Sequence, residues 1–531
     1  MPWSSNQLTI TAAQYNLPAM VEINSQRVTE ESLDMLTVQV AEAWSAGDFD
    51  HLRGLLAPLP DQTLADHPRL ALYYAWLLTS DGHYQRSAAL LDAAESAAVD
   101  SDTRRMAAAI ASLLRFQHNP EPQKAMELAQ ALLEAQAPEG DRWRPIILLT
   151  LANAATQLGQ NDRAEKAFYQ AAAHSDRQRV DYLIFLAHHN LFNHLEALGR
   201  LQQIESLSRD LLRRQLSGLL EPRLSYLAHF HLGTVLMEWN ERPAAFTQFN
   251  AGLEMAQSLN FVTGQMNTLT RLALLHTLDG HPTKAGACLD KLEQLSQSRS
   301  AIATGRVVYI ARAYIALVRT EMDLAAHWLS LAEFRIKPAE KDLAFDEPDH
   351  YLVQASYLVR QGGEHIQQAV TILERLLDYV TKTGQLRLHI GALLQQALAR
   401  HALEEDQAAL RILESALQLG ATENYMISFL TAGGPLPQLL SRITPESPQH
   451  AYAQRILAAF KALPSNSEQS LSEREIEILR YVASGLSNAN VAGELYISVN
   501  TVKAHLKSVY GKLGVSNRAA AVDRAHQLSL L

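Results

Sequence analysis

The sequence predicts an all-α protein in which a long array of helical hairpins precedes a small unit of four helices. Three observations lead to this prediction. A fixed spacing of small and large residues recurs about every 40 residues, strand-like alternation of β-branched residues is nearly absent, and serine helix caps recur through the last sixty or so residues. With 47% hydrophobic residues, the 531-residue chain can bury the core that such an array needs.

The recurring frame is clearest in residues 150–172, TLANAATQLGQNDRAEKAFYQAA. Gly159 is followed by Ala164, Phe168 and Ala171, at spacings of five, four and three. A turn-forming residue ends a first helix, a small residue then lets a second helix approach it, and the large residue fills the gap between them. The expected turns are centred on Gly47, Gly82, Pro120, Gly159, Gly199, Asn240, Gly280, Thr320, Gly363 and Glu404.

A hairpin of this kind cannot bury its own apolar face, so neighbouring hairpins must stack into a continuous core. The frame matches the tetratricopeptide pattern with a period longer than the usual 34 residues, which indicates longer helices. The sequence therefore predicts a tetratricopeptide-like α-solenoid of about ten repeats over residues 31–443. Residues 1–30 fit no repeat and are expected to form a cap or a tail. Within 423–443, a Gly-Gly-Pro turn is expected between a final helix and a short closing helix.

The remaining residues divide into a connection and a last domain. Residues 444–466 contain three prolines and predict a connecting helix, over about 452–463, followed by a linker. In the domain of residues 467–531, Ser472 with Glu475 predicts a capping box at the start of a first helix. Ser487 and Ser498 are expected to cap a second and a third helix, joined by a tight turn. This arrangement is a helix-turn-helix, with a fourth helix starting near Arg518.

The third helix of this domain is expected to be basic on one face. Lys503 and Lys507 are four residues apart and therefore share a face. Such a face fits the major groove of duplex DNA, where lysines reach phosphates and base edges. The opposite, core-facing stripe is formed by Val502, Leu506, Val509 and Leu513.

This domain resembles the DNA-binding domain of the LuxR/FixJ-type bacterial transcription regulators. The matching residues are Leu471, Arg474, Glu475, Ile478, Leu479, Gly485, Ser487, Asn488, Ala492, Leu495, Ser498, Thr501, Val502, Lys503, His505, Leu506, Tyr510, Lys512, Leu513 and Arg518. Ala489 and Asn490 depart from the family, which usually has a basic and an acidic residue there.

The resemblance implies roles for individual residues. It places Lys503, Ala504 and Lys507 against base edges, and it makes residues 519–528 the dimer contact. It places Asn488, Thr501 and Lys512 near phosphates. His505 and Arg518 are two further candidates for DNA contact. His505 can equally pack against a neighbouring helix, and Lys512 and Arg518 can equally be surface charges.

The order of solenoid, closing segment, linker and helix-turn-helix resembles the C-terminal half of the MalT-like large ATP-binding regulators. Those proteins carry a nucleotide-binding domain upstream, but this sequence contains no Gly-x-x-x-x-Gly-Lys-Ser/Thr motif. We therefore expect no cofactor and do not transfer an ATP-driven switch. In the family the solenoid is the inducer sensor.

The concave side of the solenoid is the expected ligand site, because superhelical arrays line it with their first helices. Polar side chains there could hold a sugar, a peptide or a metabolite, but they could equally be solvated positions of a scaffold. The candidate groove residues are Asn153, His189, Asn193, Thr234, Thr270 and Tyr314.

Several other classes of protein are disfavoured. Because Cys288 is the only cysteine, a disulfide framework is excluded. The histidines of 187–194 lack the spacing of a metal site. No nucleophile motif indicates an enzyme. No apolar run of about 18 residues or signal peptide is present, so we expect a cytoplasmic protein without a membrane contact. Residues 1–466 carry a net charge of −11 and the rest +1, which leaves DNA contact to the C-terminal domain.

The sequence thus predicts a transcription regulator that binds a promoter site in double-stranded DNA, as a homodimer. RNA polymerase and an unidentified small-molecule or protein effector are its other expected partners, and the solenoid would control DNA binding or dimerisation. The alternative is a solenoid scaffold for protein partners whose C-terminal module binds DNA non-specifically or only docks.

Overall fold

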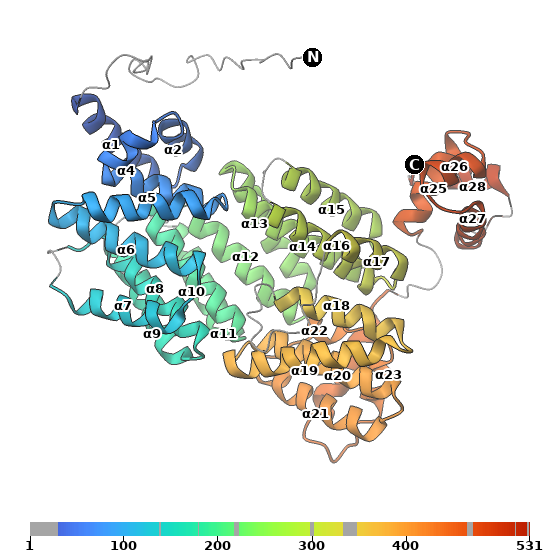
Figure 1. Cartoon of the computed structure of the whole chain (residues 1–531). Coiled ribbons are helices and arrows are strands. Elements are labelled where there is room, and N and C mark those ends of the chain that lie inside the picture. Colours follow the sequence, from blue (N-terminus) through green and yellow to red (C-terminus); the bar gives the residue numbers. More distant parts are fainter. Residues whose placement is uncertain are drawn as a thin grey trace.

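The structure is a computed structural model that describes residues 30–136, 140–178, 180–216, 222–297, 302–332, 348–464, 471–513, 515, 517–527 and 530–531. All regular elements in these residues are helices (Figure 1), which confirms the all-α prediction. The expected cap or tail at the N-terminus lies outside the described residues except for Glu30, as does the linker from residue 465 to 470.

The described residues of the array form ten helical hairpins. The first helices are α1 (Glu30–Ala46), α4 (Pro68–Ser80), α6 (Ser101–His118), α8 (Arg144–Gln157), α10 (Asp181–Ala197), α12 (Pro222–Glu238), α14 (Val262–Leu278), α16 (Ile302–Val318), α18 (Pro348–Gln361) and α20 (Leu386–Ala402). The second helices are α2 (Phe49–Leu56), α5 (Tyr84–Ala97), α7 (Pro122–Glu134), α9 (Asn161–Gln178), α11 (Leu201–Leu216), α13 (Arg242–Ser258), α15 (Pro282–Gln297), α17 (Met322–Leu331), α19 (His365–Thr383) and α21 (Asp406–Thr422). A short extra helix, α3 (Asp61–Asp66), separates the first two hairpins.

The turns confirm the frame seen in the sequence. Nine of the ten predicted turn residues have a positive φ, and Pro120 is the exception. Asn240 shows how such a turn ends a helix: its φ is 62°, and its N–H and that of Glu241 donate 2.8 Å bonds to the carbonyls of Met237 and Leu236. The frame residues after Gly159, namely Ala164, Phe168 and Ala171, are buried as expected.

The array curls until helices far apart in sequence touch. Helix α10 packs both on α1 and on α20. The side-chain amide of Asn161 donates to the Thr383 carbonyl (3.2 Å), 222 residues away. Where the middle of the array meets its first hairpin, the Arg223 guanidinium donates to the carbonyls of Ala46 and Gly47 at 2.7 and 2.9 Å. Figure 1 shows the last repeats lying beside the middle of the array for this reason.

The segment after the last hairpin closes the array. It forms α22 (Ile427–Leu430), a turn at Gly433 and Gly434, and α23 (Leu436–Ser441), as expected from the Gly-Gly-Pro signal. The Met426 N–H donates to the Glu238 carbonyl (2.7 Å), and the Trp239 indole N–H donates to the Glu423 carbonyl (2.9 Å). The expected connecting helix is α24 (His450–Ala462), whose apolar face belongs to the core of the array.

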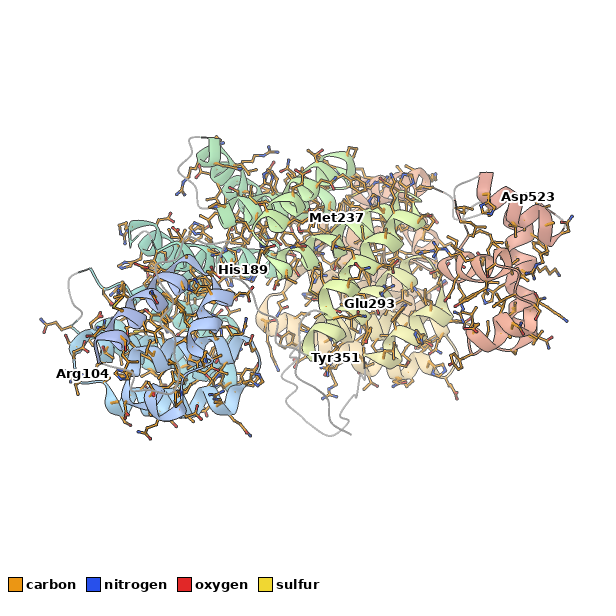
Figure 2. All side chains as sticks on the ribbon, turned by 90° about the horizontal axis from the view of Figure 1, so that it is seen from above. Arg104, His189, Met237, Glu293, Tyr351 and Asp523 are labelled. Carbon is orange, nitrogen blue, oxygen red and sulfur yellow. The ribbon has the colours of Figure 1, made fainter. Side chains whose placement is uncertain are left out.

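The C-terminal helices have a hydrophobic core of their own. They are α25 (Glu473–Ala483), α26 (Asn488–Glu494), α27 (Val499–Leu513) and α28 (Arg518–Gln527). Both views show them as a small separate body (Figures 1 and 2). Among the described residues, no helix combines the length and the apolar character needed to cross a membrane.

Candidate DNA-binding surface and ligand cavity

Serine caps position the helices of the C-terminal unit. The Ser472 hydroxyl accepts from the Glu475 N–H (3.2 Å), and the Ser472 N–H donates to the Glu475 carboxylate (2.7 Å), which completes the capping box. Ser487 accepts from the Asn490 N–H at 3.2 Å. Ser498 accepts from the Thr501 N–H at 3.0 Å. All three predicted caps are confirmed, so local sequence alone sets where these helices begin.

Helix α27 has one buried and one exposed face. Val502, Leu506 and Val509 are buried in the core shared with α25, α26 and α28. Lys503 and Lys507 are exposed together on the other face. The amphipathic pattern predicted for this helix is thereby confirmed for the side chains that the structure describes.

The other candidate DNA-contact residues occupy different positions. Ala504 and Thr501 are exposed, and the Thr501 hydroxyl lies 2.8 Å from that of Ser498 at the start of α27. Asn488 and His505 are half-buried. The side chain of Lys512 lies outside the described residues.

Arg518 is used inside the domain. Its guanidinium Nη2 donates to the carbonyls of Val482 (2.8 Å) and Leu486 (2.7 Å), where α25 ends. A cation at a helix C-terminus satisfies carbonyls that have no partner within the helix. The structure thus gives Arg518 a packing role that neither of the two sequence readings, DNA contact or free surface charge, included.

Replacing Arg518 by alanine is expected to destabilise the C-terminal unit. Hydrogen bonds from a charged group contribute about 1.5–3 kcal/mol each, and 1 kcal/mol shifts the Tm of a small domain by roughly 4–8 °C. Thermal unfolding of residues 467–531 should therefore start at least several degrees lower. Arg480→Ala, which removes an exposed arginine of α25, is the matched control. An unchanged Tm for Arg518→Ala would contradict the packing role.

Because the array curls, its axis is enclosed by first helices in both halves. In the N-terminal half the axis is filled by aromatic side chains. Trp44 lies 5.6 Å from Trp76 and 5.8 Å from Trp143, measured between ring centroids. The Trp76 indole N–H donates to the Tyr182 hydroxyl at 3.2 Å. A small space of about 90 Å³ lies beside these rings.

In the C-terminal half the axis is hollow. A cavity of about 640 Å³ lies between α10, α12, α14, α16, α18, α20 and α22. Its wall combines apolar side chains with charged and polar ones, and Met237, labelled in Figure 2, marks its position in the middle of the array. The charged side chains of the wall are Glu196, Glu238, Arg271, Asp349, Arg360 and Arg387.

Four of these charges form two ion pairs. Arg271 Nη2 lies 2.9 Å from Glu196 Oε1, and His231 Nδ1 lies 3.3 Å from Glu196 Oε2. Burial alone would raise the pKa of Glu196, but its bond to His231 and the Arg271 charge outweigh burial and lower the pKa to about 2. Arg387 pairs with Asp349, which raises the pKa of the arginine.

Glu238 is a buried carboxyl without an arginine partner in the described residues. It accepts bonds from the Ser428 N–H (3.3 Å) and the Ser428 hydroxyl (3.2 Å). Burial raises its pKa, and the charges of Arg387 and Arg271 oppose this only in part. The cavity therefore holds one carboxyl whose pKa is raised, Glu238, and one whose pKa is lowered, Glu196.

Comparison with known families follows the same division of the chain. Residues 105–446 match the family model described as the MalT-like TPR region. The chain belongs to the MalT-like TPR family. Residues 469–525, which include α25, α26 and α27, match the model of the bacterial regulatory proteins of the luxR family.

Two curated relatives of this MalT-like chain are both named HTH-type transcriptional regulator MalT. The protein of Vibrio parahaemolyticus serotype O3:K6 (strain RIMD 2210633) is 23% identical, and that of Vibrio campbellii (strain ATCC BAA-1116) is 22% identical. Each alignment covers 91% of this chain and 57% of the relative, so the chain spans little more than half the length of these relatives. Among solved structures, one match is to a chain of the APC/C hetero-tetramer Cut9–Hcn1. The match covers 81% of this chain and 96% of that chain, at 14% sequence identity and a TM-score of 0.33.

The MalT-like array brings some of the predicted groove residues together and separates others. Asn193, Thr270 and Tyr314 line the large cavity, whereas Asn153 lines the small space in the N-terminal half. The other two residues lie outside both linings. Thr234 is buried, and its hydroxyl donates to the Phe230 carbonyl of the same helix (3.0 Å).

His189, the remaining groove candidate, stacks on a ring rather than lining the cavity. Its ring lies 5.6 Å from that of Phe185, and its Nε2 lies 3.0 Å from Asn193 Nδ2. Burial lowers its pKa to about 4. Figure 2 shows this residue where the first repeats of the MalT-like array meet its middle.

Sequence reasoning missed the charged residues of the cavity wall. A signal was present, because Glu196, Glu238, Arg271 and Arg360 lie beyond the first turn of first helices that are rich in apolar residues, α10, α12, α14 and α18. A charge at the middle or end of such a helix requires either a partner or a solvent-filled space. Only the closure of the array shows that these positions face one another.

Proposed function

We propose that this chain acts as a transcription regulator that binds duplex DNA through α27. The single observation that supports this most strongly is the exposed pair Lys503 and Lys507 on a capped helix whose opposite face is buried, within the region that matches the luxR family. A helix of this kind fits the major groove, where its exposed side chains reach base edges.

DNA binding is proposed to require two copies of the chain. A unit of about sixty residues offers few phosphate contacts, so a monomer binds weakly and with a steep dependence on salt. Two copies on adjacent half-sites would double the contacts. Helix α28 is the proposed dimer contact. It buries Ala521 and Ala525 in its own domain and leaves Ala519 exposed.

The array is proposed to sense a small polar molecule and to control whether the C-terminal units can bind DNA. This proposal is supported by the cavity of about 640 Å³, which has the size and the mixture of apolar and polar groups of a small-molecule site. In the N-terminal half of the array, by contrast, aromatic side chains pack against one another between the first helices.

Selection of binding sites from a random duplex library tests the proposal. The full chain and residues 467–531 would be selected in parallel, each across a salt series. We expect both to enrich the same two-fold site. A full chain that binds less well than the fragment would make the array an inhibitor, and tighter binding would make it the source of dimerisation. If neither enriches a sequence, the regulator proposal fails and the scaffold alternative takes its place.

A further inference from the structure

One arginine of the cavity wall differs from the others. Arg360, at the end of α18, reaches the closing segment, where its Nη2 donates to the carbonyls of Ala432 (2.7 Å) and Thr431 (3.2 Å). The turn at Gly433 packs closely against the Arg360 guanidinium, because a Cβ added to that glycine would lie 2.5 Å from Nη2. Its other terminal nitrogen, Nη1, is buried and has no hydrogen-bond partner among the described residues.

A second orphaned polar group lies in the same part of the wall. Gln395 of α20 is 4% exposed, and its side-chain amide donates to the same Ala432 carbonyl at 3.4 Å. Its Oε1 is buried without a hydrogen-bond partner in the described residues. A donor on Arg360 and an acceptor on Gln395 are therefore both unsatisfied where the two side chains meet one carbonyl. Buried polar groups of this kind are rare, because each costs free energy unless a partner fills the site.

The ion pairs of the cavity wall indicate which kind of partner Arg360 lacks. Arg271 and Arg387 already have carboxylate partners, and Glu238 is satisfied by Ser428. Arg360 forms no ion pair with any described carboxylate and is held only by neutral carbonyls. In agreement, burial lowers the pKa of Arg360. A guanidinium N–H donates a charge-assisted hydrogen bond to a carboxylate or phosphate oxygen, and the N–H groups of Nη1 are the ones still without an acceptor in the described residues.

We propose that the ligand of this cavity is a small organic anion, whose carboxylate or phosphate group binds Arg360 and whose hydroxyl or amine donates to Gln395. This inference rests on the proposed sensing function and names the chemical class that the site accepts. The remaining volume, with Asn193 and Thr270 in its wall, accommodates the uncharged part of such a molecule.

Three probes with the same carbon skeleton test the charge requirement. D-gluconate carries a carboxylate, D-glucose 6-phosphate carries a phosphate, and D-glucose is neutral. Binding to the full chain would be measured by titration calorimetry and by the shift in Tm, at constant ionic strength. We expect saturable binding of at least one anion, with glucose at least about 10-fold weaker. The stronger anion identifies which of the two groups the site prefers.

Variants locate the binding. Arg360→Gln keeps hydrogen-bond donors but removes the charge, and it should weaken anion binding roughly 10- to 100-fold. Arg360→Lys keeps the charge but has a single terminal nitrogen, which cannot serve both the Ala432 and Thr431 carbonyls and a ligand, so it should lie in between. Arg400→Gln is the matched control, because Arg400 of α20 pairs with Glu405 and does not line the cavity, so its replacement should leave binding unchanged.

Four results would overturn the inference: no saturable binding of either anion, equal binding by Arg360→Gln, equal binding of glucose, or loss of binding in the Arg400→Gln control. Should glucose bind and change DNA affinity, the cavity would remain a sensor with a different ligand class. Failure of the site selection described above would instead remove the regulator function and leave anion binding to be judged by itself.

Discussion

The double substitution Lys503→Ala with Lys507→Ala should reduce binding to the selected DNA site at least about 30-fold. Base-edge contacts contribute about 1–3 kcal/mol each, and 1.4 kcal/mol corresponds to a factor of ten. Both lysines are exposed and are not needed for the fold, so Tm should stay unchanged. Fluorescence anisotropy with the selected site and with an unrelated duplex would show the two affinities converging, because the lost contacts are those that read sequence.

The matched control removes two lysines from the array, Lys124 and Lys166, which are exposed on α7 and α9. Their replacement by alanine changes the net charge by the same amount and should leave the affinity and its salt dependence nearly unaltered. If the α27 variant retained affinity within about 3-fold of the unchanged chain, α27 would not be the recognition helix. An equal loss in the control would show that total charge, and not this face, governs binding.

Asp141→Ala should cost the N-terminal half of the array about 3–5 kcal/mol. Asp141 accepts two bonds from Arg105, at 2.6 and 3.1 Å, and both side chains are at most 7% exposed. The same arginine donates to the Leu132 carbonyl at 2.6 Å. Removing the carboxylate leaves a buried guanidinium without its counter-charge, which is among the most costly changes in a protein interior.

Replacing both residues separates the free-energy cost of an unpaired buried charge from the contribution of the ion pair to stability. Arg105→Met combined with Asp141→Leu fills the space without any charge and should recover most of the lost stability. Because repeats unfold locally, hydrogen exchange of the amides of α6 and α8 is the appropriate measurement alongside Tm. If the single and the double variant were equally unstable, packing at this position and not the unpaired charge would explain the loss.

Features that depend on neighbours in sequence were predictable. The turn positions follow from residues that tolerate a positive φ, such as Asn240, and from the small residue that must come five positions later. The caps at Ser472, Ser487 and Ser498 and the apolar stripe of α27 are equally local. For this reason the hairpins and α27 could be located from the sequence to within a few residues.

Features that depend on closure of the array were not predictable. The bond between Asn161 and Thr383 joins residues 222 positions apart, and no periodic pattern encodes such a contact. The cavity could therefore be predicted only in part. Thr234 has the right spacing, but its hydroxyl is satisfied within its own helix. Arg360 and Gln395 become candidates only when the closing segment is seen to lie against both.

Closure of the array around α10 also fixes how this protein can change over evolutionary time. In an open solenoid each repeat touches only its neighbours, so a repeat can be gained or lost without disturbing the rest. Here α10 touches both α1 and α20, and Trp239 anchors Glu423. Loss of one hairpin between α12 and α19 would move these partners out of register and open the cavity. Change in the cavity must therefore proceed by substitution along its wall, with the number of repeats held constant.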